Sequence, residues 1–128
     1  MNSQLTVYKA SAGSGKTFTL AKEYMTLVIE SPMAYRTILA VTFTNKATEE
    51  MKMRILSQLY GIAHGLEESN GYFEQIKKAL PHLSEEVIRK NAAEALRLLL
   101  HNYNYFRVQT IDTFFQGVLR NLARELDL

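Results

Sequence analysis

Eight consecutive residues near the amino terminus constrain the fold of this chain more than any other stretch. They read Ala10-Ser11-Ala12-Gly13-Ser14-Gly15-Lys16-Thr17. Their spacing is that of a phosphate-binding loop, G-x-x-x-x-G-K-[ST], with Ala10 at the position of the first glycine. A short apolar run, Leu5 to Tyr8, precedes the loop, and a helical pattern follows it. The order strand, glycine-bearing loop, helix predicts an α/β fold.

The residue types in this loop suit a bound anion. Gly13 and Gly15 have no Cβ atom, so backbone N–H groups can approach phosphate oxygens closely. The amino end of the following helix adds free N–H groups and the positive end of the helix dipole. Lys16 can reach the β- and γ-phosphates of ATP, and the Thr17 hydroxyl can bind Mg²⁺, which takes few protein ligands. We predict that residues 10–17 bind ATP, with Lys16 and Thr17 as catalytic residues and Thr17 on the metal. A plain helix cap of small residues is the alternative.

Two more apolar runs have the character of strands. Residues Thr37 to Phe43 are rich in β-branched side chains and almost continuously apolar, which is typical of a strand buried on both faces. Residues Tyr105 to Thr110 form the third candidate, and Leu5 to Tyr8, which leads into the loop, is expected at the centre of the sheet. Because strands alternate with helical patterns, we predict a parallel sheet whose right-handed crossovers place helices on both faces.

Helical periodicity predicts helices at about 16–30, 45–63, 72–80 and 85–101, and a last helix that begins at Asp112 or Thr113. Residues 61–71 are polar and rich in glycine, and are expected to form a surface connection. Thr44 and Ser84 are expected to be N-caps, whose hydroxyls accept hydrogen bonds from free backbone N–H groups. The expected apolar faces are Ala47, Met51, Ile55, Leu59 and Ile62 in the second helix, Val87, Ile88, Ala92, Ala95, Leu96, Leu99 and Leu100 in the fourth, and Phe114, Phe115, Val118, Leu119, Leu122 and Leu126 in the last.

Composition narrows the class of protein. The chain has 128 residues, 47% of them hydrophobic and 22% charged, which fits one globular domain. The absence of cysteine excludes disulfides and thiolate metal sites. No apolar run approaches the ~20 residues that span a bilayer, and the first residues do not form a secretory signal, so we expect a cytoplasmic protein without a membrane partner. The net charge of +2 is compatible with nucleic acid but too small to argue for it.

Three stretches taken together resemble the first motor domain of UvrD/RecB-type superfamily 1 DNA helicases. The first is ASAGSGKTFTL at 10–20, whose form is most similar to the RecB/AddA branch of helicase–nuclease subunits. The second is AVTFTNKATEEM at 40–51, which resembles the motif that lies against single-stranded DNA in this family. The third is VQTIDTFF at 108–115, which resembles the T-x-H-[SG]-F segment at the same DNA track. The resemblance covers about residues 5–63 and 105–124.

This resemblance implies a P-loop NTPase (RecA-like) partial domain, a parallel sheet flanked by helices, over residues 1–128. It implies that these residues are the N-terminal part of a UvrD-like helicase ATP-binding domain, with ATP and Mg²⁺ as cofactors. The implied partners are single- or double-stranded DNA and, in the longer protein, a second helicase–nuclease subunit. In such a sheet, ligands bind beyond the carboxyl ends of the strands. The residues expected there as DNA contacts are Phe43, Thr44, Asn45, Lys46, Thr110 and Phe114.

The polar members of this set also have purely structural interpretations. Thr44 is expected to cap a helix whatever else it does. Lys46 could be a solvated surface charge, and Asn45 could serve only the first helical turn. Thr110 could be an ordinary residue at the end of a strand.

The aromatic members and one acidic residue require the same weighing. Phe43 and Phe114 are candidates for stacking on bases, although such side chains belong more often to a core, where Phe115 is expected. Asp112 stands where the family often has histidine. Because a carboxylate repels phosphate, we interpret Asp112 as an N-cap, which leaves the third DNA contact open.

One part of the ATPase machinery is not found in the sequence. No apolar run ends in Asp-Asp or Asp-Glu, the acidic motif that helps to hold Mg²⁺. We therefore expect the chain to be an N-terminal fragment of a larger ATP-dependent DNA helicase, inactive by itself, with a nuclease domain if the RecB/AddA likeness holds. The alternatives are a nucleotide- or single-stranded-DNA-binding module that does not hydrolyse ATP, and a P-loop kinase or small NTPase, which usually carries the acidic motif within its single domain.

Overall fold

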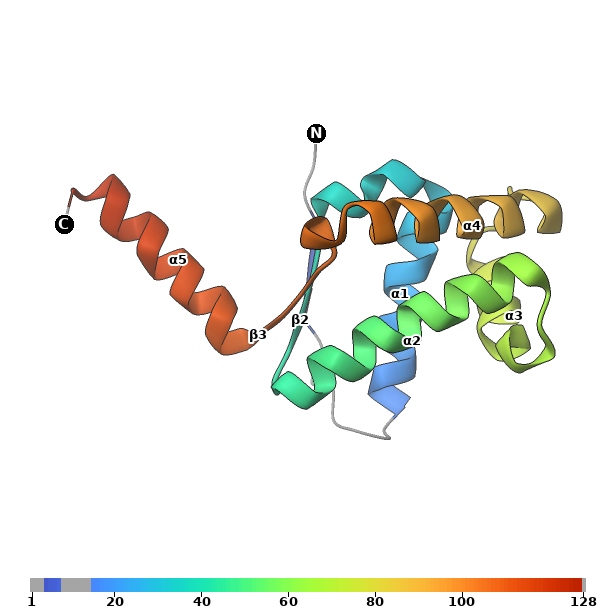
Figure 1. Cartoon of the computed structure of the whole chain (residues 1–128), viewed down its shortest axis with the longest axis horizontal. Helices are drawn as coiled ribbons and strands as arrows, with labels where there is room; N and C mark the ends of the chain where they lie inside the picture. Colours follow the sequence, from blue (N-terminus) through green and yellow to red (C-terminus); the bar gives the residue numbers. More distant parts are fainter. Residues whose placement is uncertain (1–3, 8–14, 128) are drawn as a thin grey trace.

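The computed structural model describes residues 4–7 and 15–127, and shows strands between helices (Figure 1). The chain order is β1 (Gln4–Val7), α1 (Gly15–Glu30), η1 (Pro32–Thr37), β2 (Ile38–Thr42), α2 (Asn45–His64), η2 (Glu67–Ser69), α3 (Asn70–Ala79), α4 (Glu85–His101), η3 (Tyr103–Tyr105), β3 (Arg107–Thr110) and α5 (Ile111–Glu125). The predicted strands and helices are all present, and their ends differ from the expected ones by a few residues. Within the described residues, no helix is long and apolar enough to cross a membrane.

The sheet is parallel throughout, as expected, and has the order β1-β2-β3. Val7 pairs with Val41, and Thr42 pairs with Thr110. The expectation that β1 lies at the centre is wrong for the described sheet, because β2 has a hydrogen-bonded neighbour on each side. The apolar character of β2 accounts for this place, since a central strand is covered on both faces.

Helices lie on both sides of the strands, as predicted (Figure 1). Helices α1, α2 and α4 pack together on one side, whereas α5 lies on the other and contacts β2 and β3. Ile38, Ala40 and Val108 belong to the core shared with α1, α2 and α4. The chain is therefore α/β, with a parallel sheet flanked by helices. The hand of the crossovers stays a prediction.

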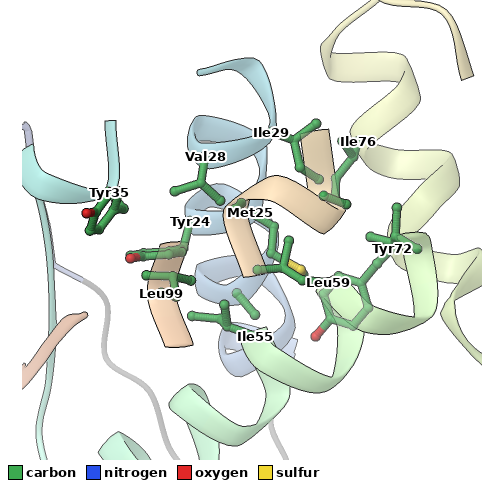
Figure 2. Close-up of a cluster of buried hydrophobic side chains, with 14 of the residues drawn as sticks. Tyr24, Met25, Val28, Ile29, Tyr35, Ile55, Leu59, Tyr72, Ile76 and Leu99 are labelled. Carbon is green, nitrogen blue, oxygen red and sulfur yellow. The ribbon is translucent and has the colours of Figure 1, made fainter. Parts of the chain in front are cut away.

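The core lies mainly between helices rather than on the sheet (Figure 2). Figure 2 shows Met25 of α1 among side chains of the neighbouring helices, including Leu59 of α2. The apolar face expected for α2 is buried at all five positions. On α4, however, Val87 and Leu100 are exposed, while Leu98 is buried. Periodicity identified the face of α4 correctly but placed its margins too wide.

The connection between α2 and α3 is more ordered than its composition indicated. Helix α2 continues through Gly61 to His64 and ends at Gly65, whose φ of 68° is a left-handed angle that favours glycine. Gly61 lies directly against Ser69, because a Cβ atom on Gly61 would be 1.8 Å from Ser69 Oγ. Gly61 is therefore not part of a loose loop, and its missing side chain lets η2 pack onto α2.

Tyr24 provides a test of the core. Its side chain is 2% exposed, and its hydroxyl has no hydrogen-bond partner within the described part of the chain. Because an unpaired buried hydroxyl costs free energy, we expect Tyr24→Phe to raise the free energy of unfolding by about 1 kcal/mol near pH 8. Urea unfolding measures this change, with Tyr35→Phe as the control, since the Tyr35 hydroxyl accepts a hydrogen bond from Arg36 Nε at 3.3 Å.

The same substitution has a consequence at alkaline pH. Burial raises the pKa of Tyr24 above its ordinary value, so the folded state keeps the neutral phenol while the unfolded chain ionises. This contribution to stability is fully present below about pH 10 and falls as pH rises from there. We expect the difference in stability between Tyr24→Phe and the unsubstituted protein to widen between about pH 8 and 10.5. A destabilised phenylalanine variant at both pH values would contradict this account.

Candidate functional site

The carboxyl ends of the three strands meet at one edge of the sheet, here called the carboxyl edge. The pairing of Val7 with Val41 and of Thr42 with Thr110 brings these ends level. The chain therefore leaves β2 towards α2, and β3 towards α5, side by side. Figure 1 shows the start of α1 at the same end of the molecule as the start of α2. In open parallel sheets, this edge is where ligands bind.

The β2–α2 turn exposes several groups that suit an anion. Thr44 caps α2 as predicted, and its Oγ1 accepts a hydrogen bond from Ala47 N at 3.0 Å. Asn45 and Lys46 are exposed, and no acidic residue lies in the first turn of α2. Phe43, just before the cap, is 48% exposed, so the interpretation of this side chain as core is wrong. The turn thus offers an ammonium group, an amide and an aromatic ring next to a helix amino end.

The β3–α5 turn is capped by Thr110 rather than Asp112. Thr110 Oγ1 accepts a hydrogen bond from Thr113 N at 3.2 Å and donates one to Thr113 Oγ1 at 3.0 Å. The interpretation of Asp112 as the N-cap is wrong, because β3 ends at Thr110 and α5 begins at Ile111. Asp112 lies in the first turn, where its carboxylate still suits the helix dipole.

The two phenylalanines that follow differ from the expectation of a buried pair. Phe114 is partly buried and lines a cleft between α5 and the outer face of β2 and β3. Phe115 was expected in the core but is 54% exposed. The reason is that α5 turns only one side towards the sheet, and none of its described side chains is buried.

The predicted phosphate loop lies mostly outside the described residues. This applies to Ala10 through Ser14 and to the side chain of Lys16. Gly15 and Lys16 are the first two residues of α1, and Thr17 follows, buried, in the same turn. No acidic residue stands in this first turn. The described part of the site therefore fits a phosphate, because an uncompensated helix amino end faces the region that the loop enters.

Two groups of residues near this edge were not expected from the sequence. The hydroxyls of Thr42 and Thr48 are buried together beneath the β2–α2 turn. Their sequence signal is a threonine on the buried side of a helix, next to the apolar stripe. The cleft beside Phe114 is the second group; it carries two arginines and no acidic residue and is lined by Leu39, Arg107, Gln109, Thr113, Phe114, Gly117, Arg120 and Asn121.

The fold and this edge define an α/β domain with three helix amino ends gathered for an anionic ligand. The UvrD/REP helicase N-terminal domain family matches residues 1–128, and the chain belongs to that family. The resemblance seen in the sequence is thereby confirmed. No solved structure matches the chain.

Several curated proteins are similar over most of this chain. The RecBCD enzyme subunit RecB of Escherichia coli (strain K12) is 33% identical over 128 residues, which cover 91% of this chain and 10% of that protein. RecB of Borreliella burgdorferi is 32% identical over 98% of this chain and 10% of its own length. An ATP-dependent helicase/nuclease of Clostridium botulinum is 31% identical over 93% of this chain and 8% of that protein. The chain thus spans about a tenth of the length of these relatives.

The cap of α5 can be tested with a matched pair of variants. Thr110→Ala removes the hydroxyl that accepts from Thr113 N, so we expect the first turn of α5 to lose about 1 kcal/mol of stability. Asp112→Ala removes only a favourable charge near the helix amino end, which is worth a few tenths of that, and alanine is the better helix former. Amide hydrogen exchange at residues 113–116 measures both effects. Faster exchange in Asp112→Ala than in Thr110→Ala would restore Asp112 as the cap.

Proposed function

We propose that these 128 residues are the N-terminal part of the ATP-binding domain of a longer ATP-dependent DNA helicase or translocase. The parent protein is proposed to be a helicase–nuclease that acts in double-strand-break repair and recombination. One observation carries the proposal: the carboxyl edge gathers the phosphate-loop helix and both DNA motifs of the family. The names of the RecB and helicase/nuclease relatives support it. A P-loop, RecA-like sheet is the fold that this function requires.

On the nucleotide side, residues 10–17 wrap the phosphates of ATP. Gly13 and Gly15 leave room for backbone N–H groups, and the start of α1 supplies the positive end of its dipole. Lys16 neutralises charge on the β- and γ-phosphate oxygens, and Thr17 offers its hydroxyl to Mg²⁺. Mg²⁺, when bound, neutralises charge that develops on the transferred phosphoryl group.

On the DNA side, the two exposed turns contact one strand. The start of α2 supplies the Lys46 ammonium group, the Asn45 amide and the Thr44 hydroxyl to a backbone phosphate. Phe43, which is exposed just before the cap, stacks on a base. Thr110 and Phe114 extend the same track along the neighbouring turn, where Asp112 argues against a close phosphate.

Hydrolysis needs residues that this sequence does not show. No apolar run ends in a pair of acids, so the Mg²⁺-binding carboxylate, the group that positions water and the arginine that stabilises the transition state are proposed to come from the rest of the parent. The isolated chain is expected to be inactive. A second helicase–nuclease subunit is the proposed partner of the parent, which acts on DNA in the cytoplasm.

The missing acidic motif also favours a second candidate function. A module that binds nucleotide or single-stranded DNA without hydrolysis would need the loop and the exposed turns but no such carboxylate. ATPase activity of the parent, measured with and without DNA, separates the two, because a binding module shows none.

Lys16 tests the phosphate loop. Lys16→Ala removes the cation that contacts the phosphates, so we expect it to abolish ATP hydrolysis and translocation in the parent while single-stranded DNA binding stays within about twofold. ATPase assays and fluorescence anisotropy measure the two properties. Lys22→Ala, on the same helix, is the control for a general loss of positive charge. Retained ATPase activity in Lys16→Ala would show that the loop was assigned wrongly.

Phe43 tests the DNA side. Phe43→Ala removes an exposed ring from the β2–α2 turn, and base stacking of this kind contributes about 1–3 kcal/mol, so we expect binding of labelled oligo-dT to weaken about tenfold. Leu100→Ala on α4, another exposed apolar residue, is the matched control and leaves the affinity unchanged. Equal affinities of the two variants would exclude Phe43 from the DNA track.

A further inference from the structure

Two threonine hydroxyls are buried together where β2 meets α2. Thr42, the last residue of β2, is 1% exposed, and Thr48, in the first turn of α2, is 8% exposed. Their Oγ1 atoms are 2.6 Å apart, which is a short hydrogen bond. The side chains of Ala40 and Met51 nearby in the chain are apolar and buried. The pair is therefore a polar contact at the margin of an apolar core.

The distances favour one arrangement of the protons. Each hydroxyl has a single proton to donate. Thr48 Oγ1 lies 3.1 Å from the carbonyl oxygen of Thr44, whereas Thr42 Oγ1 lies 3.4 Å from that oxygen and 3.4 Å from the carbonyl oxygen of Gln109. The shortest bonds are formed when Thr42 donates to Thr48 and Thr48 donates to the Thr44 carbonyl. This chain of hydrogen bonds ends on the residue that caps α2.

The Thr44 carbonyl is held from two directions. It accepts a hydrogen bond from Thr48 Oγ1 at 3.1 Å and another from Thr48 N at 3.0 Å. Because the peptide unit is planar, fixing this carbonyl also fixes the N–H group of Asn45 on the opposite side. That N–H is among the groups without an intrahelical partner at the start of α2. The buried hydroxyls thus set the direction of a donor at the carboxyl edge.

Hydroxyls are not required here by packing. A valine at 42 and an alanine at 48 would suit the strand and the helix, and would bury no polar atom. A buried hydroxyl costs free energy unless it is bonded, and the gain from the bond roughly offsets that cost. What the pair adds is direction, because its bonds hold one peptide plane in place.

We infer that Thr42 and Thr48 are positioning residues, which orient the amino end of α2 so that its N–H groups, with Lys46, bind a phosphate of the DNA backbone. The inference rests on the proposed function for its ligand. The orientation of the turn itself rests only on the hydrogen bonds described above. Neither threonine touches the DNA, so each acts through Thr44 and Asn45.

Matched substitutions separate the hydroxyl from the shape of the side chain. Thr48→Val and Thr42→Val keep the shape and lose the hydroxyl, whereas Thr48→Ser and Thr42→Ser keep the hydroxyl. Thr26→Val is the control, because Thr26 on α1 donates to Lys22 O at 2.7 Å, away from the edge. Two properties are measured for each folded variant: amide hydrogen exchange at residues 45–48 relative to α4, and the affinity for labelled oligo-dT.

Loss of one net hydrogen bond is worth about 1 kcal/mol, so each valine variant should exchange about fivefold faster at the turn and bind oligo-dT about fivefold more weakly. The serine variants should retain both properties, and Thr26→Val should change neither. If Thr48→Val does not fold, Thr42→Val decides in the same way. Unchanged exchange in the valine variant, or a serine variant that behaves like it, would overturn the inference.

The two proposals fail in different ways. If the unsubstituted chain does not bind oligo-dT, but the valine variants still exchange faster and the serine variants do not, the positioning role stands and the DNA contact is wrong. If the chain binds oligo-dT and the valine variants bind equally well, the DNA contact stands and the positioning role is wrong.

Discussion

The parallel pairing of β2 with a strand on each side is the constraint on which the rest of the structure depends. Parallel strands that are in register end at one edge, so the pairs Val7–Val41 and Thr42–Thr110 bring together turns that lie far apart in the chain. The helices that follow must then start at that edge. The site is thus a product of strand order and register, and the packed helices keep it in place.

The electrostatics of the edge follow from the same geometry. Each helix amino end carries a partial positive charge, and the first turns of α1 and α2 contain no acidic residue to neutralise it. The α5 turn differs, because Asp112 lies in its first turn. The field therefore favours phosphate most strongly at α1 and α2, which are the proposed places of the nucleotide and of the DNA backbone. On α5, Thr110 and Phe114 are better suited to sugar or base than to phosphate.

Local signals in the sequence predicted most of this fold. Regular apolar spacing defined α1 and α2, and hydroxyl caps at Thr44 and Ser84 were correct, because caps and periodicity depend on neighbours in the chain. The place of β1 in the sheet was wrong, since strand order depends on distant contacts. At the β3–α5 turn, both Thr110 and Asp112 are good caps, and only the observed end of β3 decides between them.

Of the candidate site, the contents were predicted better than the surroundings. Amphipathic spacing showed that α5 has an apolar side, but it could not show that Phe115 on that side is exposed. Phe43 was hard to place for the same reason, since an aromatic residue after a buried strand fits either a core or a surface. The Thr42–Thr48 contact joins residues only six positions apart, but it depends on how α2 turns back towards β2.

The central claim is that the carboxyl edge binds both nucleotide and DNA, and residue-level NMR mapping tests it most directly. The labelled 128-residue chain would be titrated separately with Mg-ATP and with oligo-dT. We expect Mg-ATP to shift amide resonances at residues 15–17, and oligo-dT to shift those at residues 43–46 and 110–114, at the same edge. Shifts concentrated on α3 and α4, away from this edge, would contradict the account.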